Sequence, residues 1–80
     1  MTIQLLFFGI TADLVGGSSI TYKIDKPLNI RKFKEQLIHD YKALKNINEF
    51  AIAVNEEYAC DDLILQNNDE VAIIPPVSGG

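Results

Sequence analysis

The sequence has few of the residues that carry catalysis, metal binding or disulfide chemistry. Among 80 residues there are one cysteine, one histidine and no tryptophan, with seven lysines and arginines against eleven aspartates and glutamates. A single cysteine excludes an intramolecular disulfide and fits a reducing compartment, so we expect a cytoplasmic protein. The net charge of −4 argues against nucleic-acid and anionic-membrane surfaces, and it fits a partner with a basic docking surface.

Long apolar stretches are also missing. No run approaches the ~18 residues of a membrane-spanning helix. No basic segment precedes the first apolar run, so neither a membrane span nor a signal peptide is expected. The composition, 48% hydrophobic and 22% charged, is that of one small folded domain. We expect this domain to be a monomer when it is alone.

The few reactive side chains lack the neighbours that catalysis requires. Cys60 is followed by Asp61 and Asp62, whose charges disfavour a reactive thiolate. His39 stands beside Asp40 and has no second histidine or cysteine at ligand spacing. The glycine and aspartate-asparagine clusters lack the spacing of a phosphate or calcium loop. The sequence therefore predicts no metal, no bound cofactor and no catalytic side chain of its own.

Five short runs bounded by turn residues predict β-strands, at 3–8, 20–25, 50–54, 58–59 and 70–74. One segment has the period of a helix: it begins after Asn29, a suitable N-cap, and its apolar face consists of Ile30, Phe33, Leu37 and Tyr41. Turns are expected at 13–19 and 67–69, a polar loop at 42–49 and a helical turn at 61–65.

This element order predicts an α+β domain with a mixed sheet of four to five strands and one main helix packed on one face. The first two strands lie close enough in sequence to pair as an antiparallel hairpin. The order of strands and helix is that of the ubiquitin-like β-grasp. We expect the β-grasp domain to span 1–74 and an extended tail to span 75–80.

The first strand is apolar on both faces, although one helix covers only one face of a sheet. Leu6 and Phe8 point to the helix-free face. Tyr58 and Ile74 are expected to join them in an exposed apolar patch, which is typical of a partner-binding site. The alternative is that the loop at 42–49 covers this patch.

The C-terminal sequence Pro-Pro-Val-Ser-Gly-Gly (75–80) is the most specific motif. Gly79 and Gly80 have no Cβ, so they make a thin thread that can enter a narrow active site, and the prolines stiffen the approach. If extended, the last four residues reach roughly 13–14 Å beyond Pro76. A frayed end is the alternative reading. We favour a reactive tail that presents its terminal carboxylate.

Two segments of the last third resemble a known family. They are Val-Asn-Glu-Glu-Tyr at 54–58, and Asn-Asp-Glu-Val-Ala-Ile-Ile at 68–74 with the ending that follows it. Together they resemble the small, sulfur-carrier subunit of molybdopterin synthase, the MoaD-like proteins. The resemblance implies that an E1-like enzyme uses ATP to adenylate the carboxylate of Gly80, which is then converted to a thiocarboxylate. The loaded tail then donates sulfur to a pterin precursor within the large subunit of the synthase.

The resemblance also implies roles for single residues. Gly80 is the reactive terminus, and the inserted tail comprises Gly79, Ser78 and Val77. The surface that faces the large subunit comprises Phe8, Tyr58, Ile74 and Pro75. The implied assembly is a heterotetramer with two large subunits, in which this chain acts in a sulfurtransferase without catalytic side chains. Many members carry an Arg-Glu pair where this chain has Ala12-Asp13, so a charged contact is lost or supplied elsewhere.

Two other functions stay open at this point. One is a related sulfur carrier that serves thiazole synthesis or tRNA thiolation, although thiazole carriers are generally shorter and rarely share this ending. The other is a non-catalytic ubiquitin-like binding module with an inert tail. Such a module would tolerate residues added after Gly80, whereas a carrier would not.

Overall fold

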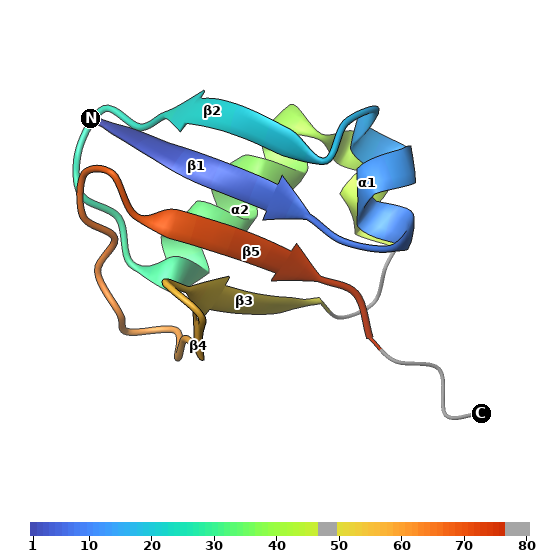
Figure 1. Cartoon of the computed structure of the whole chain (residues 1–80). Helices are drawn as coiled ribbons and strands as arrows, with labels where there is room; N and C mark the ends of the chain where they lie inside the picture. The colour runs from blue at the N-terminus through green and yellow to red at the C-terminus, as the bar shows by residue number, and fades with distance from the viewer. Residues whose placement is uncertain (47–49, 77–80) are drawn as a thin grey trace.

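A five-stranded sheet forms the frame of the computed structural model, which describes residues 1–46 and 50–76. Its strands are β1 (Thr2–Phe7), β2 (Ser19–Lys23), β3 (Ala51–Val54), β4 (Glu57–Tyr58) and β5 (Glu70–Ile74). Their order in the sheet is β2-β1-β5-β3-β4. β1 and β5 run parallel side by side, and the other neighbours are antiparallel (Figure 1). The predicted mixed sheet and the hairpin of the first two strands are confirmed.

Helix α2 (Ile30–Asp40) crosses one face of this sheet, and it begins where the sequence predicts. The side chain of Asn29 accepts a hydrogen bond from the backbone N–H of Lys32 at 2.8 Å, as an N-cap should. The N–H groups of the first two residues of α2 also have partners. Ile30 donates to the carbonyl of Leu63 at 3.0 Å, and Arg31 donates to the carbonyl of Asp61 at 3.2 Å. The start of α2 is therefore satisfied by its own cap and by the 61–63 segment.

The core lies between α2 and the sheet. The inward residues of β1 and β5 expose 2% or less of their surface, as do those of α2: Ile3, Leu5, Phe7, Val71, Ile73, Ile30, Phe33 and Leu37. Alternation along the strands sends every second side chain into this core. Burying each large side chain contributes roughly 1.5–3 kcal/mol. The face of the sheet that α2 covers is therefore the one that stabilises the fold.

The connection between β1 and β2 differs from the predicted turn, because it contains a short helix, α1 (Ile10–Val15). Gly16 ends this helix in the left-handed conformation, with φ 80°, and its N–H donates to the carbonyl of Ala12. Six residues are too few to show a helical period, and Gly9 in the N-cap position offers no side-chain cap. The sequence therefore indicated only the turn at Gly16 that ends α1, and not the helix itself.

Two further segments differ from the predictions. The start of the expected loop at 42–49 is a 3-10 helix, η1 (Lys42–Asn46), which contacts α1 and α2 and fully buries Leu44. Because Leu44 is buried and η1 contacts α1 and α2, residues 42–46 do not cover the apolar patch. Residues 47–49 lie outside the described residues. The 61–65 segment is a turn followed by a bridge between Ile64 and Asn29. The carbonyls of Asp61 and Leu63 accept hydrogen bonds from the first backbone N–H groups of α2 and so are not used in a helical turn.

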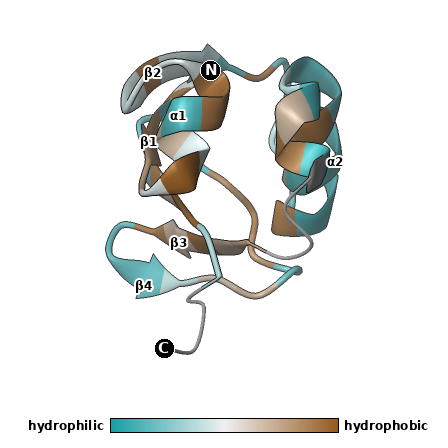
Figure 2. Ribbon diagram, turned by 90° about the vertical axis from the view of Figure 1, so that its right-hand side faces the viewer, coloured by the Kyte–Doolittle hydropathy of each residue, from teal (hydrophilic) through white to brown (hydrophobic). Residues whose placement is uncertain are grey.

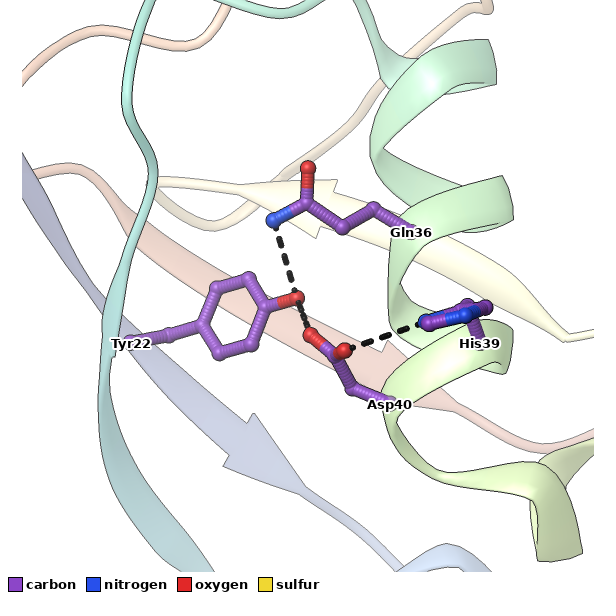
Figure 3. Close-up of polar contacts among 4 residues, drawn as sticks. All are labelled: Tyr22, Gln36, His39 and Asp40. Atoms are coloured by element: carbon purple, nitrogen blue, oxygen red, sulfur yellow. Dashed lines mark hydrogen bonds and ion pairs between the residues drawn. The ribbon is translucent and has the colours of Figure 1, made fainter.

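A partly buried polar network connects the edge strand β2 to the end of α2 (Figure 3). The hydroxyl of Tyr22 donates to the carboxylate of Asp40 and accepts from the side chain of Gln36 at 3.2 Å. The Tyr22 ring, 8% exposed, also packs edge-on against Phe33. Burial raises the pKa of Tyr22 above its ordinary value of 10.0, and the hydrogen bond to Asp40 raises it further. His39 lies beside Asp40, with 3.5 Å between its Nδ1 and Oδ1 of Asp40.

Tyr22→Phe should therefore lower the free energy of unfolding by about 1 kcal/mol near neutral pH, because the partly buried hydrogen bonds of the hydroxyl with Asp40 and Gln36 are lost. The fold favours neutral tyrosine, so the contribution is complete below the unfolded-state pKa of about 10 and is lost as the pH rises further. Urea unfolding at pH 7 to 11.5 should show the difference from the wild type shrinking above pH 10. Tyr58→Phe, on a ring that is 76% exposed, is the matched control. A pH-independent difference would contradict this role for Tyr22.

Candidate functional site

The face of the sheet opposite α2 has no covering element in the described ranges 1–46 and 50–76. Figure 2 shows α2 standing to one side of the strands, with the other side open. The outward residues at the centre of this face are Leu6, Ala72 and Ala53, which the strand register places in one row across β1, β5 and β3. The described residues thus agree with the predicted open face and do not agree with a covering loop.

A groove of about 340 Å³ crosses this open face. It is lined by Leu6, Phe8, Ala53, Glu56, Tyr58, Glu70, Ala72 and Ile74. The small side chains of Ala53 and Ala72 leave the space, because larger side chains lie on both sides of them. Phe8 is 50% exposed and Tyr58 is 76% exposed, although both are large aromatic residues. The structure therefore brings together three of the predicted contact residues, Phe8, Tyr58 and Ile74.

Charge gives the groove a second property. Glu56 and Glu70 line it beside the apolar residues. All seven lysines and arginines of the chain fall between residues 23 and 45, whereas residues 46–80 hold seven acids and no lysine or arginine. The acidic residues of the groove are a feature that the hydrophobic pattern did not reveal. An apolar groove with acidic residues at its side matches a partner surface in which basic residues flank apolar ones.

The C-terminal tail starts at the end of this groove. Ile74 is the last residue of β5 and lines the groove, and the half-buried Pro75 follows it directly. Figure 1 shows the chain leaving the sheet beyond the tip of β5. The predicted tail residues Val77, Ser78, Gly79 and Gly80 lie outside the described residues. The described part of the site is therefore the groove and the first two residues of the tail.

The remaining candidate residues lie apart from this groove. Cys60 is an exposed free thiol that lines a second groove, of about 490 Å³, together with Leu63 and Ile64. Both of these apolar side chains are exposed, Leu63 by 39% and Ile64 by 46%. Across residues 1–46 and 50–76, no group of three or more histidine, cysteine, aspartate or glutamate side chains could hold a metal ion. Within the same ranges no helix has the length and hydropathy to cross a membrane.

Comparison with known proteins shows where the chain belongs. The ThiS family matches residues 5–80. The molybdopterin synthase sulfur carrier subunit of Arabidopsis thaliana is 35% identical, over 98% of this chain and 82% of the relative. The subunit of the same name from Dictyostelium discoideum is 39% identical, over 96% of this chain and 94% of the relative. Both alignments include nearly the whole of this chain.

Solved structures agree on the fold. A putative molybdopterin converting factor subunit 1 from Pyrococcus furiosus superposes with a TM-score of 0.85, at 21% identity, over 96% of this chain and 99% of the other. In a complex of subunits 1 and 2 of the molybdopterin-converting factor from Helicobacter pylori, the matched chain has a TM-score of 0.68 at 24% identity, with both chains fully covered. The predicted ubiquitin-like β-grasp is confirmed.

The fold agrees with that of the solved structures, and two relatives are more than 30% identical over most of their length. The chain belongs to the ThiS family, among the molybdopterin synthase sulfur carrier subunits.

Proposed function

We propose that this protein carries sulfur for molybdopterin synthesis as a thiocarboxylate on Gly80. The observation that most supports the proposal is the continuity of groove and tail: β5 lines the apolar groove with Ile74 and passes directly into the Pro-Pro-Val-Ser-Gly-Gly ending. A partner that docks on the groove is thereby placed next to the start of the tail. The names of the curated relatives point to the same function.

The chemistry explains why the carrier needs no catalytic side chain. A carboxylate is a poor electrophile, so an E1-like enzyme joins the Gly80 carboxylate to the AMP part of ATP and releases pyrophosphate. Sulfur at the oxidation level of sulfide then attacks the acyl-adenylate, AMP leaves, and a thiocarboxylate remains without any redox step. A thiocarboxylate is anionic at neutral pH and is a strong sulfur nucleophile. Its sulfur bonds to the pterin precursor, and water then cleaves the bond between this sulfur and the acyl carbon, so the sulfur stays on the precursor and the terminus returns to a carboxylate. ATP is thus a substrate of the activating enzyme.

The proposed docking surface for the large subunit comprises Phe8, Tyr58, Ile74 and Pro75. Exposed aromatic rings beside an apolar groove are typical anchors of protein interfaces, since burying such a ring removes a large apolar area from water. The complex of two subunits that contains the Helicobacter pylori relative supports a two-subunit assembly here. We propose a heterotetramer with two large subunits, formed in the cytoplasm. Carriers for thiazole or tRNA thiolation share the terminal chemistry, so the acceptor decides between them.

Deleting Gly80 should abolish sulfur transfer while docking persists. The deletion moves the carboxylate back by about 3.5 Å, and misplacement by even ~1 Å can cost on the order of a hundredfold in rate. Intact-mass analysis should show no ATP-dependent exchange of oxygen for sulfur at the shortened terminus. The shortened chain should still compete with the intact carrier for the large subunit. A chain extended by one residue after Gly80 should also stay uncharged. If either variant is charged and supports pterin sulfuration, the requirement for Gly80 as the last residue is refuted. An intact chain that is never charged would favour the binding-module function.

Phe8→Ala should weaken binding of the large subunit by about 2 kcal/mol, or roughly thirtyfold in Kd, because an aromatic anchor is lost. Phe8 is half exposed in the free protein, so the free energy of unfolding should change little. Ile10→Ala is the matched control: Ile10 is 56% exposed but does not line the groove. Calorimetric titration and urea unfolding separate the two effects. Unchanged affinity with a loss of stability would assign Phe8 to the core instead.

Cys60→Ser should leave the rate of sulfur transfer within about tenfold of the wild type, equivalent to 1.4 kcal/mol in the barrier. The thiol is exposed on the segment after β4 and is followed by two aspartates. Single-turnover sulfuration of the pterin precursor measures this rate. A larger loss would mean that sulfur passes through Cys60 on its way to or from the terminus.

A further inference from the structure

A tight turn joins β1 to α1 and lies beside the start of the tail. The N–H of Thr11 donates to the carbonyl of Phe8 at 3.1 Å, which closes the turn. Gly9 has φ 56° and ψ −136°. These are close to the values of the first central residue of a type II′ turn, a position that glycine dominates because a Cβ is disfavoured there. The sequence therefore needs glycine at position 9 for the backbone to turn so sharply.

This turn also holds the end of β5. The N–H of Phe8 donates to the carbonyl of Ile73 at 3.2 Å. The hydroxyl of Thr11 lies 2.5 Å from the carbonyl oxygen of Phe8 and 3.4 Å from that of Ile73. Thr11 is the one fully buried polar side chain among the described residues. The turn is thus hydrogen-bonded to Ile73, near the end of β5, the strand that precedes the tail.

Contact continues beyond the strand, at the first residue of the tail. A Cβ added to Gly9 would lie 3.1 Å from Cγ of Pro75, which is tighter than ordinary van der Waals contact. The missing side chain at Gly9 therefore makes room for the Pro75 ring. Proline has a fixed φ, so the placement of its ring constrains the direction of the residues that follow.

We propose that Gly9 is a positioning residue for the sulfur-transfer reaction: it seats Pro75 and thereby sets the direction in which the reactive tail leaves the sheet. The inference rests on the proposed function. From Pro75 to Gly80 an extended chain spans about 17 Å, so a tilt of about 10° at Pro75 displaces the terminus by about 3 Å. When the partner holds the groove at Phe8, the tail entrance is fixed relative to the sheet, and such a displacement slows the chemistry.

Gly16 provides a control for backbone strain. It also has a positive φ, 80°, but a Cβ there would meet nothing within 4 Å. Gly9→Ala and Gly16→Ala therefore both strain the backbone, and only the first displaces Pro75. Pro75→Ala removes the ring without strain at position 9. A double variant, Gly9→Ala with Pro75→Ala, tests whether the two positions act through one contact.

The experiment uses the full-length carrier, loaded as the thiocarboxylate, with saturating large subunit. Single-turnover transfer should be at least tenfold slower for Gly9→Ala and within twofold of the wild type for Gly16→Ala. Affinity for the large subunit should stay within threefold for both. The double variant should transfer at the rate of Pro75→Ala, because without the Pro75 ring the Cβ added at position 9 has no ring to displace. Urea unfolding confirms that each variant is folded under the assay conditions.

Three results would overturn the inference. These are equal rates for Gly9→Ala and Gly16→Ala, a loss of affinity in place of rate, or strictly additive effects in the double variant. If Gly9→Ala fails to fold, Pro75→Ala decides at saturating large subunit, where a weaker docking contact at Pro75 does not limit the rate. Slower single-turnover transfer then supports a seated Pro75, and an unchanged rate refutes it. A wild-type chain that is never charged with sulfur would instead refute the proposed function, so the two failures are distinct.

Discussion

The parallel pairing of β1 with β5 is the constraint on which the rest of the molecule depends. It joins the first and last strands of the chain, and its register aligns Leu6 with Ala72 and Phe7 with Ile73. Continued by one and two residues, this register places Phe8 near Ile74 and Gly9 near Pro75, where a Cβ added to Gly9 would lie 3.1 Å from the proline ring. One backbone ladder therefore builds the docking groove and also determines where the tail begins.

The two faces of the sheet then have separate tasks. The inward residues of β1 and β5 are buried against α2 and supply the stability of a small domain. The outward residues gain nothing from that core, so their size and polarity are free to suit a partner. Ala53 and Ala72 hollow the face, Phe8 and Tyr58 stay exposed beside the hollow, and the acidic residues lie nearby. A domain with one helix on one face has an interaction surface as a consequence of its architecture.

Local signals in the sequence predicted the parts of the fold that depend on local physics. Alternation of apolar and polar residues predicted the strands, and the helical period with the Asn29 cap predicted α2. The apolar outer face of β1 indicated the groove. The predictions were wrong where an element is too short to show a period or where distant contacts determine the local structure. α1 is too short to show a period, and η1 is held by Leu44 in the core. The 61–65 segment forms a turn and a bridge, and the carbonyls of Asp61 and Leu63 accept hydrogen bonds from the start of α2.

The same distinction explains which part of the candidate site the sequence revealed. The C-terminal motif and exposed aromatics are readable because each is unusual by itself. The contact between Gly9 and Pro75 is not readable, since each residue has an ordinary local reason to be there: a tight turn needs the glycine, and proline commonly follows a strand. Only the pairing of β1 with β5 brings them together. In a carrier whose partners supply the catalytic groups, the fold can affect the reaction only by determining where the terminus is placed. A close approach such as that of Gly9 to Pro75 is one way in which the fold does so.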